Sequence, residues 1–449
     1  MKRYLTLGLI AAAILLGGCA KESSLPNATG TGTMRALNVI WGSPEVAFLI
    51  EERLIGAIAY QDMSIISEYD DLDYTFNFDA RLAGDITTTR VASQFLDVEA
   101  DKDYTFLISG ALESPDITIW EADQREWTGT ETTFEVRLAH TAASLGSVDI
   151  YLADAAVPPT LGSQIATLVF GEISDPVDLE GGAYVLTVTP AGDDTTILFT
   201  SSELSPLAQS QYLMSIFDGS ANDVAPLVAK LFNLTIGGIG TIPDSRFPPQ
   251  TRFFHTSMNF GDADIYIDDP LTAPFVSGHV FKDITAFLDM PTGTVPITYT
   301  AAGNMGSILL DFDQEVFAGT RTDFYVMTNA DGEDIRIADR ADRRPIVTQT
   351  RVRFLNTATS HDIVVIYAVP TGELIDIDLP LFPGLPLGIS PLQVAMPVGD
   401  YDFYVTETGG ETVLAGPIAL SLALGDFVET IIYENVDPAV VDFVIIPPP

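Results

Sequence analysis

The stretch "TRFFHTSMNFGDADIYI", residues 251–267, decides the fold because it recurs three more times along the chain without gaps. The other copies are "MRALNVIWGSPEVAFLI" (34–50), "VRLAHTAASLGSVDIYL" (136–152) and "VRFLNTATSHDIVVIYA" (352–368). Each copy has an arginine at its second position and, fourteen residues later, Leu49, Tyr151, Tyr266 or Tyr367. The alternation of apolar and polar residues predicts two strands joined by a turn. A catalytic cluster of one arginine, one histidine and one aspartate is the less favoured interpretation.

A second spacing repeats with the same regularity. Tyr60, Phe170, Phe281 and Leu387 are each followed fourteen residues later by the first residue of an alternating segment, which reads "YTFNF", "YVLTV", "VPITY" or "YDFYV". Two independent spacings held in four copies indicate internal duplication. The arginines are 102, 115 and 101 residues apart, so each unit has the size of a domain and exceeds a solenoid repeat.

Composition supports an all-β chain. Hydrophobic residues make up 47% of the 449 residues. Thr, Val, Ile, Phe and Tyr occur in segments of alternating polarity, which are separated by glycine and proline, of which the chain has 35 and 28. We therefore predict four tandem β-sandwich domains after a signal peptide. The expected bounds are 1–18 for the signal peptide, 19–32 for a lipidated cysteine and flexible tether, and 33–127, 131–234, 250–345 and 350–447 for repeats 1 to 4.

Two positions of the repeat carry polar side chains with a predicted structural role. The arginines are expected on the outward face of a strand or paired with an acid, and binding of a ligand is the minor alternative. Three residues later, two units have histidine and two have asparagine, which cannot act as a general base. A side chain that fastens the following turn is the favoured interpretation. These structural positions are Arg35, Asn38, Arg137, His140, Arg252, His255, Arg353 and Asn356.

The units resemble a bacterial domain-of-unknown-function family of exported proteins, often found in tandem, whose copies open with VR-x-x-H-A-S-P-D-A followed by VDVYV. The second and third copies match the "VRxxH" and "VDIY" portions, with "AASLG" and "SMNFG" in place of the "SPDA" turn. Only Ser43-Pro44-Glu45 in the first copy is close to that turn. The resemblance implies an immunoglobulin-like sandwich and carries no catalytic residue.

The N-terminus has the layout of an export signal. Lys2 and Arg3 precede a short apolar run, and Leu16-Gly17-Gly18-Cys19 resembles the lipobox of bacterial lipoproteins. Cys19 is the only cysteine, so an ordinary signal peptide would leave one exposed thiol on an exported protein. We expect lipidation of Cys19 and, because Ala20 follows it, sorting to the outer membrane.

Charge limits the partners of the protein. Removal of the first 18 residues would leave 19 basic and 62 acidic residues, a net charge of −43 that repels nucleic acid. The membrane is expected to be contacted through the lipid anchor, and an envelope glycan or a surface protein is the expected ligand. Calcium stays open as a partner, but no "DxDxDG" loop with a following Glu supports it.

Enzymatic motifs are absent from the sequence. It contains no G-x-S-x-G, no H-E-x-x-H and only four histidines, so we expect no enzyme, no catalytic residue, no cofactor and no metal site. The favoured function is a non-enzymatic envelope lipoprotein, a row of domains serving as a surface binding, adhesion or spacer module. A carboxylate-dependent hydrolase and an assembly factor that recognises exposed strands are the alternatives. Trp41, Trp120 and Trp127 are expected in packing contacts, and an exposed tryptophan would instead favour carbohydrate binding.

Overall fold

The computed structural model describes residues 27–85, 87–154, 157–220, 223–268, 273–340, 342–389 and 391–446. These residues form strands, turns and loops only, and within them no helix is long and apolar enough to cross a membrane. The expected signal peptide and Cys19 lie outside the described residues. The predicted all-β class is confirmed, with sheets packed in pairs as repeated sandwiches.

The strands form four sandwiches of two sheets each. The first contains β1 (Thr31–Asn38), β2 (Val46–Ile50), β3 (Arg53–Ile58), β4 (Asp62–Met63), β5 (Ser67–Asp70), β6 (Asp73–Ala80), β7 (Thr89–Asp97), β8 (Lys102–Ala111) and β9 (Ser114–Asp123). The second contains β10 (Thr133–His140), β11 (Val148–Asp154), β12 (Ala166–Leu168), β13 (Val177–Glu180), β14 (Tyr184–Pro190), β15 (Phe199–Thr200), β16 (Gln211–Asp218), β17 (Leu227–Asn233) and β18 (Gly238–Ile242).

The other two sandwiches repeat this order with one strand fewer. The third contains β19 (Gln250–His255), β20 (Ala263–Ile267), β21 (Val276–His279), β22 (Leu288–Asp289), β23 (Gly293–Ala301), β24 (Asn304–Val316), β25 (Arg321–Thr328) and β26 (Asp334–Asp339). The fourth contains β27 (Thr350–Asn356), β28 (Ile363–Pro370), β29 (Phe382–Pro386), β30 (Leu392–Met396), β31 (Gly399–Thr406), β32 (Val413–Leu422), β33 (Phe427–Glu434) and β34 (Val441–Ile446).

One sheet of each sandwich is built around the first strand of the repeat, and we call it the first-strand sheet. Its central pair is parallel: β1 with β8, β10 with β16, β19 with β25 and β27 with β33. The second sheet is antiparallel, and its central pair is β2 with β6, β11 with β14, β20 with β23, or β28 with β31. The quoted stretch thus contributes one strand to each sheet, which explains its fixed spacing.

Each sandwich has its own core between its two sheets. In the first, Phe48, Phe76 and Phe106 pack together with ring centroids 4.6–5.8 Å apart. Equivalent buried clusters lie inside the second, third and fourth sandwiches. Every copy therefore buries an apolar interior of its own, as expected for a duplicated domain.

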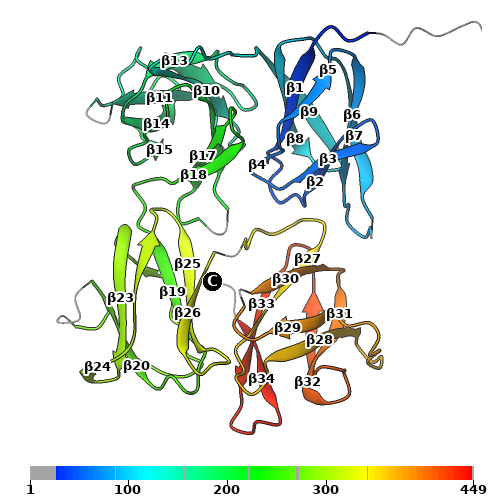
Figure 1. Cartoon of the computed structure of the whole chain (residues 1–449), viewed down its shortest axis with the longest axis vertical. Helices are drawn as coiled ribbons and strands as arrows, with labels where there is room; N and C mark the ends of the chain where they lie inside the picture. The colour runs from blue at the N-terminus through cyan, green and yellow to red at the C-terminus, as the bar shows by residue number, and fades with distance from the viewer. Residues whose placement is uncertain are drawn as a thin grey trace, which may run out of the picture.

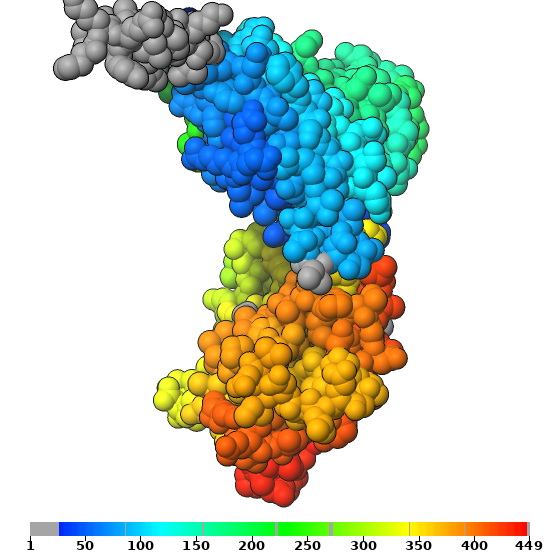
Figure 2. Space-filling model, turned by 90° about the vertical axis from the view of Figure 1, so that its right-hand side faces the viewer, coloured from blue at the N-terminus to red at the C-terminus, as the bar shows by residue number. Residues whose placement is uncertain are grey.

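The four sandwiches lie two by two (Figure 1), which differs from the row expected from the sequence. The first and second lie side by side, as do the third and fourth, and Figure 2 shows the first pair above the second with a narrower waist between them. The physical reason is that the first-strand sheets are apolar on both faces. In β1, Met34 and Ala36 point into the core of the sandwich, whereas Leu37 is equally buried but packs against the second sandwich.

Two apolar clusters therefore join the sandwiches in pairs. The first joins sandwiches one and two and consists of Leu37, Val39, Tyr60, Leu107, Trp120, Ala139, Leu213, Phe217, Val228 and Phe232. The second joins sandwiches three and four and consists of Phe254, Tyr325, Leu355, Ile431, Tyr433 and Ile446. Polar contacts supplement the first cluster, since Trp120 Nε1 donates to the carbonyl of Gly171 at 3.0 Å.

The segment 235–249, expected as a linker, contains a strand. β18 pairs antiparallel with β17 and extends the first-strand sheet of the second sandwich. The turn between them depends on Gly237, whose φ of 76° suits glycine, and on Asn233, whose Oδ1 accepts from the amide of Thr235 at 3.0 Å. The glycines of "TIGGIGTI" thus belong to a hairpin in which Ile236 and Ile239 are exposed and Ile242 is buried.

Candidate functional site

The histidine and asparagine that follow the repeat arginine contact the turn after the first strand. In the first sandwich, Asn38 Nδ2 donates to Ser43 Oγ at 3.0 Å, and its Oδ1 accepts from the amide of Ile40 at 3.0 Å. In the fourth, Asn356 Nδ2 donates to the carbonyl of His361 at 3.0 Å, and its Oδ1 accepts from the amide of Ala358 at 3.1 Å. Both side chains are buried, and in both copies Oδ1 accepts from the amide two residues later while Nδ2 donates to the residue five positions later, a hydroxyl in one copy and a carbonyl in the other.

His140 makes both corresponding contacts with its ring, and His255 makes the one through Nε2. His140 Nε2 donates to the carbonyl of Gly146 at 2.9 Å, and Nδ1 accepts from the amide of Ala142 at 3.3 Å, which requires a neutral ring. His255 Nε2 donates to the carbonyl of Gly261 at 2.7 Å. Burial lowers the pKa of both histidines, which favours the neutral form that these contacts need.

The repeat arginines point away from their own cores and toward the neighbouring sandwich. Arg252 and Arg353 are each 4% exposed, and Arg35 is 1% exposed. Arg137 is only partly buried, and its Nε donates to the carbonyl of Ser174 at 3.4 Å. The four arginines thus lie where sandwiches meet, a position that strand alternation alone does not reveal.

A charged network lies between the third and fourth sandwiches. Arg252 donates through Nε and Nη2 to the two carboxylate oxygens of Asp323 at 3.1 and 2.9 Å, and Nη2 also reaches Glu429 of the fourth sandwich at 3.1 Å. Arg353 Nη1 donates to Glu429 at 3.1 Å. Arg343, from the connection between the two sandwiches, contacts both acids.

Three acids offset the three arginines of this network, because Asp339 of the third sandwich also pairs with Arg353. Burial raises the pKa of Glu429, but hydrogen bonds from Arg343 and the charges of Arg343, Arg252 and Arg353 outweigh burial and bring this pKa below its ordinary value. Paired and hydrogen-bonded in this way, the buried ions are compatible with a closed interface. The network leaves no opening for a ligand among these residues.

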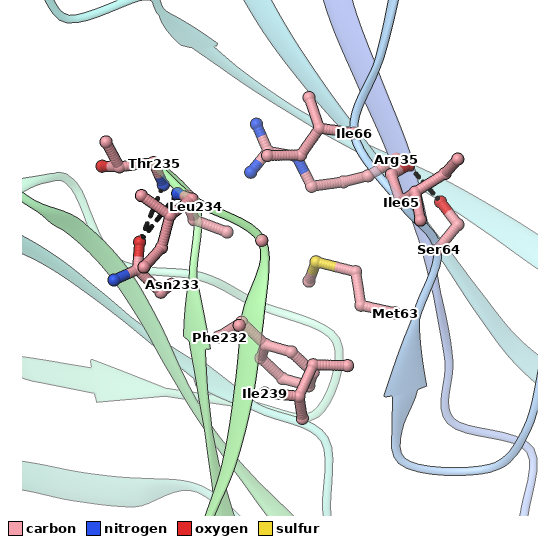
Figure 3. Close-up of a pocket in the computed structure, with 13 residues that line it drawn as sticks. Arg35, Met63, Ser64, Ile65, Ile66, Phe232, Asn233, Leu234, Thr235 and Ile239 are labelled. Carbon is pink, nitrogen blue, oxygen red and sulfur yellow. Dashed lines mark hydrogen bonds between the residues drawn. The ribbon is translucent and has the colours of Figure 1, made fainter.

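The interface between the first and second sandwiches is different because it contains an open cleft of about 510 Å³. One wall consists of β4 and the residues after it, and the other is the hairpin of β17 and β18 (Figure 3). Most of the lining side chains are apolar: Met63, Ile65, Ile66, Phe232, Leu234, Ile236 and Ile239. The guanidinium of Arg35 extends from β1 toward the turn of the opposite hairpin (Figure 3).

Sequence reasoning singled out Arg35 but none of the apolar residues of this cleft. The turn and β18 of the hairpin that forms one wall fall in 235–249, between the predicted bounds of repeats 2 and 3, and Met63 precedes a segment without a repeat signal. The glycine-rich turn of "TIGGIG" could have indicated a hairpin. In the described parts of the chain, no group of three or more His, Cys, Asp and Glu side chains is placed to hold a metal ion.

The sequence matches one family model, described as a domain of unknown function, DUF4397, over residues 32–151 and 249–367. Each match covers an odd-numbered sandwich and continues to the tyrosine in the second strand of the next. None of the curated proteins is similar enough to match.

Two solved structures show a distant likeness over much of the chain. The Bacillus anthracis TIE protein is 10% identical, with 91% of this chain and 70% of that chain covered and a TM-score of 0.16. A product complex of the multi-modular glycogen-degrading pneumococcal virulence factor SpuA is 7% identical, with 85% and 37% covered and a TM-score of 0.15. Likeness at these scores says nothing about function.

Proposed function

The chain belongs to the DUF4397 family of domains of unknown function, and from this premise we propose that it is a non-enzymatic binding module of the cell envelope. A lipid on Cys19 holds the module at the outer membrane. Its ligand is an envelope glycan or a surface protein. The resemblance of Leu16-Gly17-Gly18-Cys19 to a lipobox supports the location, and the acidic surface keeps nucleic acid away.

The observation that carries the proposal is the cleft between the first two sandwiches. Its walls come from two domains that are fixed to each other by a buried apolar cluster and by hydrogen bonds. Tyr60 Oη and Gln61 Nε2 both donate to the carbonyl of Asp218 in the second sandwich, at 3.1 and 2.8 Å. A preformed cleft loses less entropy on binding than one assembled by the ligand.

The two-by-two arrangement favours binding over spacing. A spacer gains reach when its domains lie in a row, whereas side-by-side pairs shorten the molecule and bury surface that a row would leave exposed. A carbohydrate partner has one further support, because Trp41 is 46% exposed and exposed aromatic rings can pack on apolar sugar faces.

The test is a retention assay with immobilised glycans and isolated envelope fractions, with and without calcium. The full chain is compared with Ile65→Gln, which removes a 69% exposed side chain of the cleft, and with Leu374→Gln, which removes a 91% exposed side chain elsewhere. We expect retention of the wild type and of Leu374→Gln, loss with Ile65→Gln, and no soluble products. Release of sugar products, equal retention of all three proteins, or no retention would contradict the proposal.

A further inference from the structure

The four repeats allow the surroundings of the arginine to be compared position by position. On the parallel neighbouring strand, the residue in register with Arg252 is Asp323, and the residue in register with Arg353 is Glu429. Both acids bind the arginine beside them. In the third and fourth sandwiches, a carboxylate on the adjacent strand therefore accepts hydrogen bonds from the guanidinium.

The first sandwich has no acid in this register, because the residue opposite Arg35 is Thr105. The adjacent strand instead provides Asp103, two residues earlier, whose Oδ1 pairs with Nη2 of Arg35 at 3.3 Å. Nε and Nη1 of Arg35 are buried and have no hydrogen-bond partner in the described part of the chain. Buried, charged donors without a partner are unfavourable, and they bind an incoming anion strongly when one is present.

The unsatisfied donors belong to a residue that lines the cleft. Arg35 is the only charged residue among those that line it, and the remaining walls are mainly apolar. Ile65 on one wall and Ile236 on the other are 69% and 77% exposed. The site thus combines a guanidinium at one place with a large uncovered apolar surface beside it (Figure 3).

We propose that this cleft binds a small amphipathic carboxylic acid of the fatty-acid class. Its carboxylate accepts from one of the two unpaired donors of Arg35, Nε or Nη1, and so takes the place of the in-register acid, Asp323 or Glu429, that the third and fourth sandwiches provide. Its hydrocarbon chain covers the exposed isoleucines, and the volume of about 510 Å³ is in the range of small-molecule sites. The inference rests on the proposed binding function and deepens it by naming a ligand class.

The test is calorimetric titration of the full chain with sodium decanoate and, separately, with decanol, which has the same chain without the charge. Because charge-assisted hydrogen bonds add to the affinity for decanoate only, we expect decanoate to bind at least about tenfold more tightly than decanol. Equal affinities, or no binding of decanoate, would overturn the proposal without any variant.

Two substitutions locate the binding. Arg35→Gln should weaken decanoate binding at least about tenfold and leave decanol unchanged. Thr105→Asp introduces the acid found in the third and fourth sandwiches, so it should pair with Arg35, preserve the fold and abolish decanoate binding. Arg90→Gln, which removes an arginine from a distant exposed ion pair, is the matched control and should bind as the wild type does. Unchanged binding by Thr105→Asp would overturn the assignment to Arg35.

The outcomes separate this inference from the broader function. Decanoate binding without retention on any envelope fraction would preserve the ligand site and refute the envelope partner. Retention that depends on Ile65, together with equal binding of decanoate and decanol, would preserve the binding function and refute the carboxylate site.

Discussion

Arg252 in the third sandwich and Glu429 in the fourth lie 3.1 Å apart across the interface, although 177 residues separate them in the chain. The side chains of both are almost fully buried. The pair shows that the repeat arginine, which faces away from the core of its own domain, takes part in joining two domains. It also explains why this interface is closed where the other contains a cleft.

Replacing Arg252 by Gln should destabilise the protein because Asp323 and Glu429 would lose a charged partner in a buried site. Removal of one member of a buried ion pair typically costs about 3–5 kcal/mol. Denaturant unfolding of the full chain followed by circular dichroism measures the change. Arg90→Gln in the exposed pair with Glu52 and Asp79 is the control and should have a much smaller effect. Similar effects of the two substitutions would contradict the account of the network.

The turn contact of His255 predicts an unequal response to two substitutions. His255→Asn should be nearly neutral, because Asn38 and Asn356 hold the same turn in other copies. His255→Ala should cost about 1–3 kcal/mol, since the carbonyl of Gly261 loses its donor and a fully buried side chain is removed. Unfolding of the full chain, with hydrogen exchange of residues 256–262 as the local probe, distinguishes the two. Equal stability of wild type, Asn and Ala forms would refute the turn-holding role.

Much of the strand content could be predicted because it depends on local pattern. The alternation in "TRFFHTSMNFGDADIYI" reflects two strands, one in each sheet, joined by a turn. The two fourteen-residue spacings reflect this crossing of the chain and the position of the next strand that pairs with the second. Both are set within a few dozen residues. Because the four copies are duplicates, the strands predicted in one copy could also be assigned in the others, even where the pattern of a single copy is weak.

The partners of the outward faces could not be predicted. Leu37 and Arg35 alternate with core residues as a solvent-facing stripe would, and only the tertiary structure places the second sandwich over them. The contacts of Arg343 illustrate the same limit, because its position at the end of the predicted third repeat gives no sign of an ion network with the fourth. Contacts between domains depend on orientation, which leaves no periodic signal in the sequence.

Acid should destabilise the third sandwich through its buried histidines. Burial lowers the pKa of His279 from 6.5 to about 4, and the ring lies 5.5 Å from that of His255. The unfolded chain therefore takes up a proton at a higher pH than the folded chain does. Stability contributed by the neutral ring is present above pH 6.5 and is lost as the pH falls from 6.5 toward 4.

The measurement is the free energy of unfolding of the wild type and of His279→Gln at pH 8, 6.5 and 5. At pH 8 the two proteins should differ only through packing. Between pH 6.5 and pH 5 the wild type should lose more stability than the variant, because glutamine takes up no proton. A parallel loss in both proteins would show that His279 does not contribute to the pH dependence.

The lipid anchor makes a prediction about residues outside the described structure. Cys19→Ala should abolish incorporation of a labelled fatty acid and block maturation, because the thiol that receives the lipid is lost. Metabolic labelling followed by membrane fractionation tests this expectation. A wild-type protein that carries no lipid, or a variant that fractionates with membranes as before, would refute the proposed location.

The central claim is that the sandwiches are paired side by side and that this pairing forms the cleft. Small-angle X-ray scattering of the full chain in solution tests it most directly. A compact chain of this length has a radius of gyration of roughly 22 Å by the scaling for globular proteins, and the two-by-two arrangement should lie only modestly above this value. Four sandwiches in a row would give roughly twice that radius and a rod-like distance distribution, a result that would contradict the pairing and remove the site.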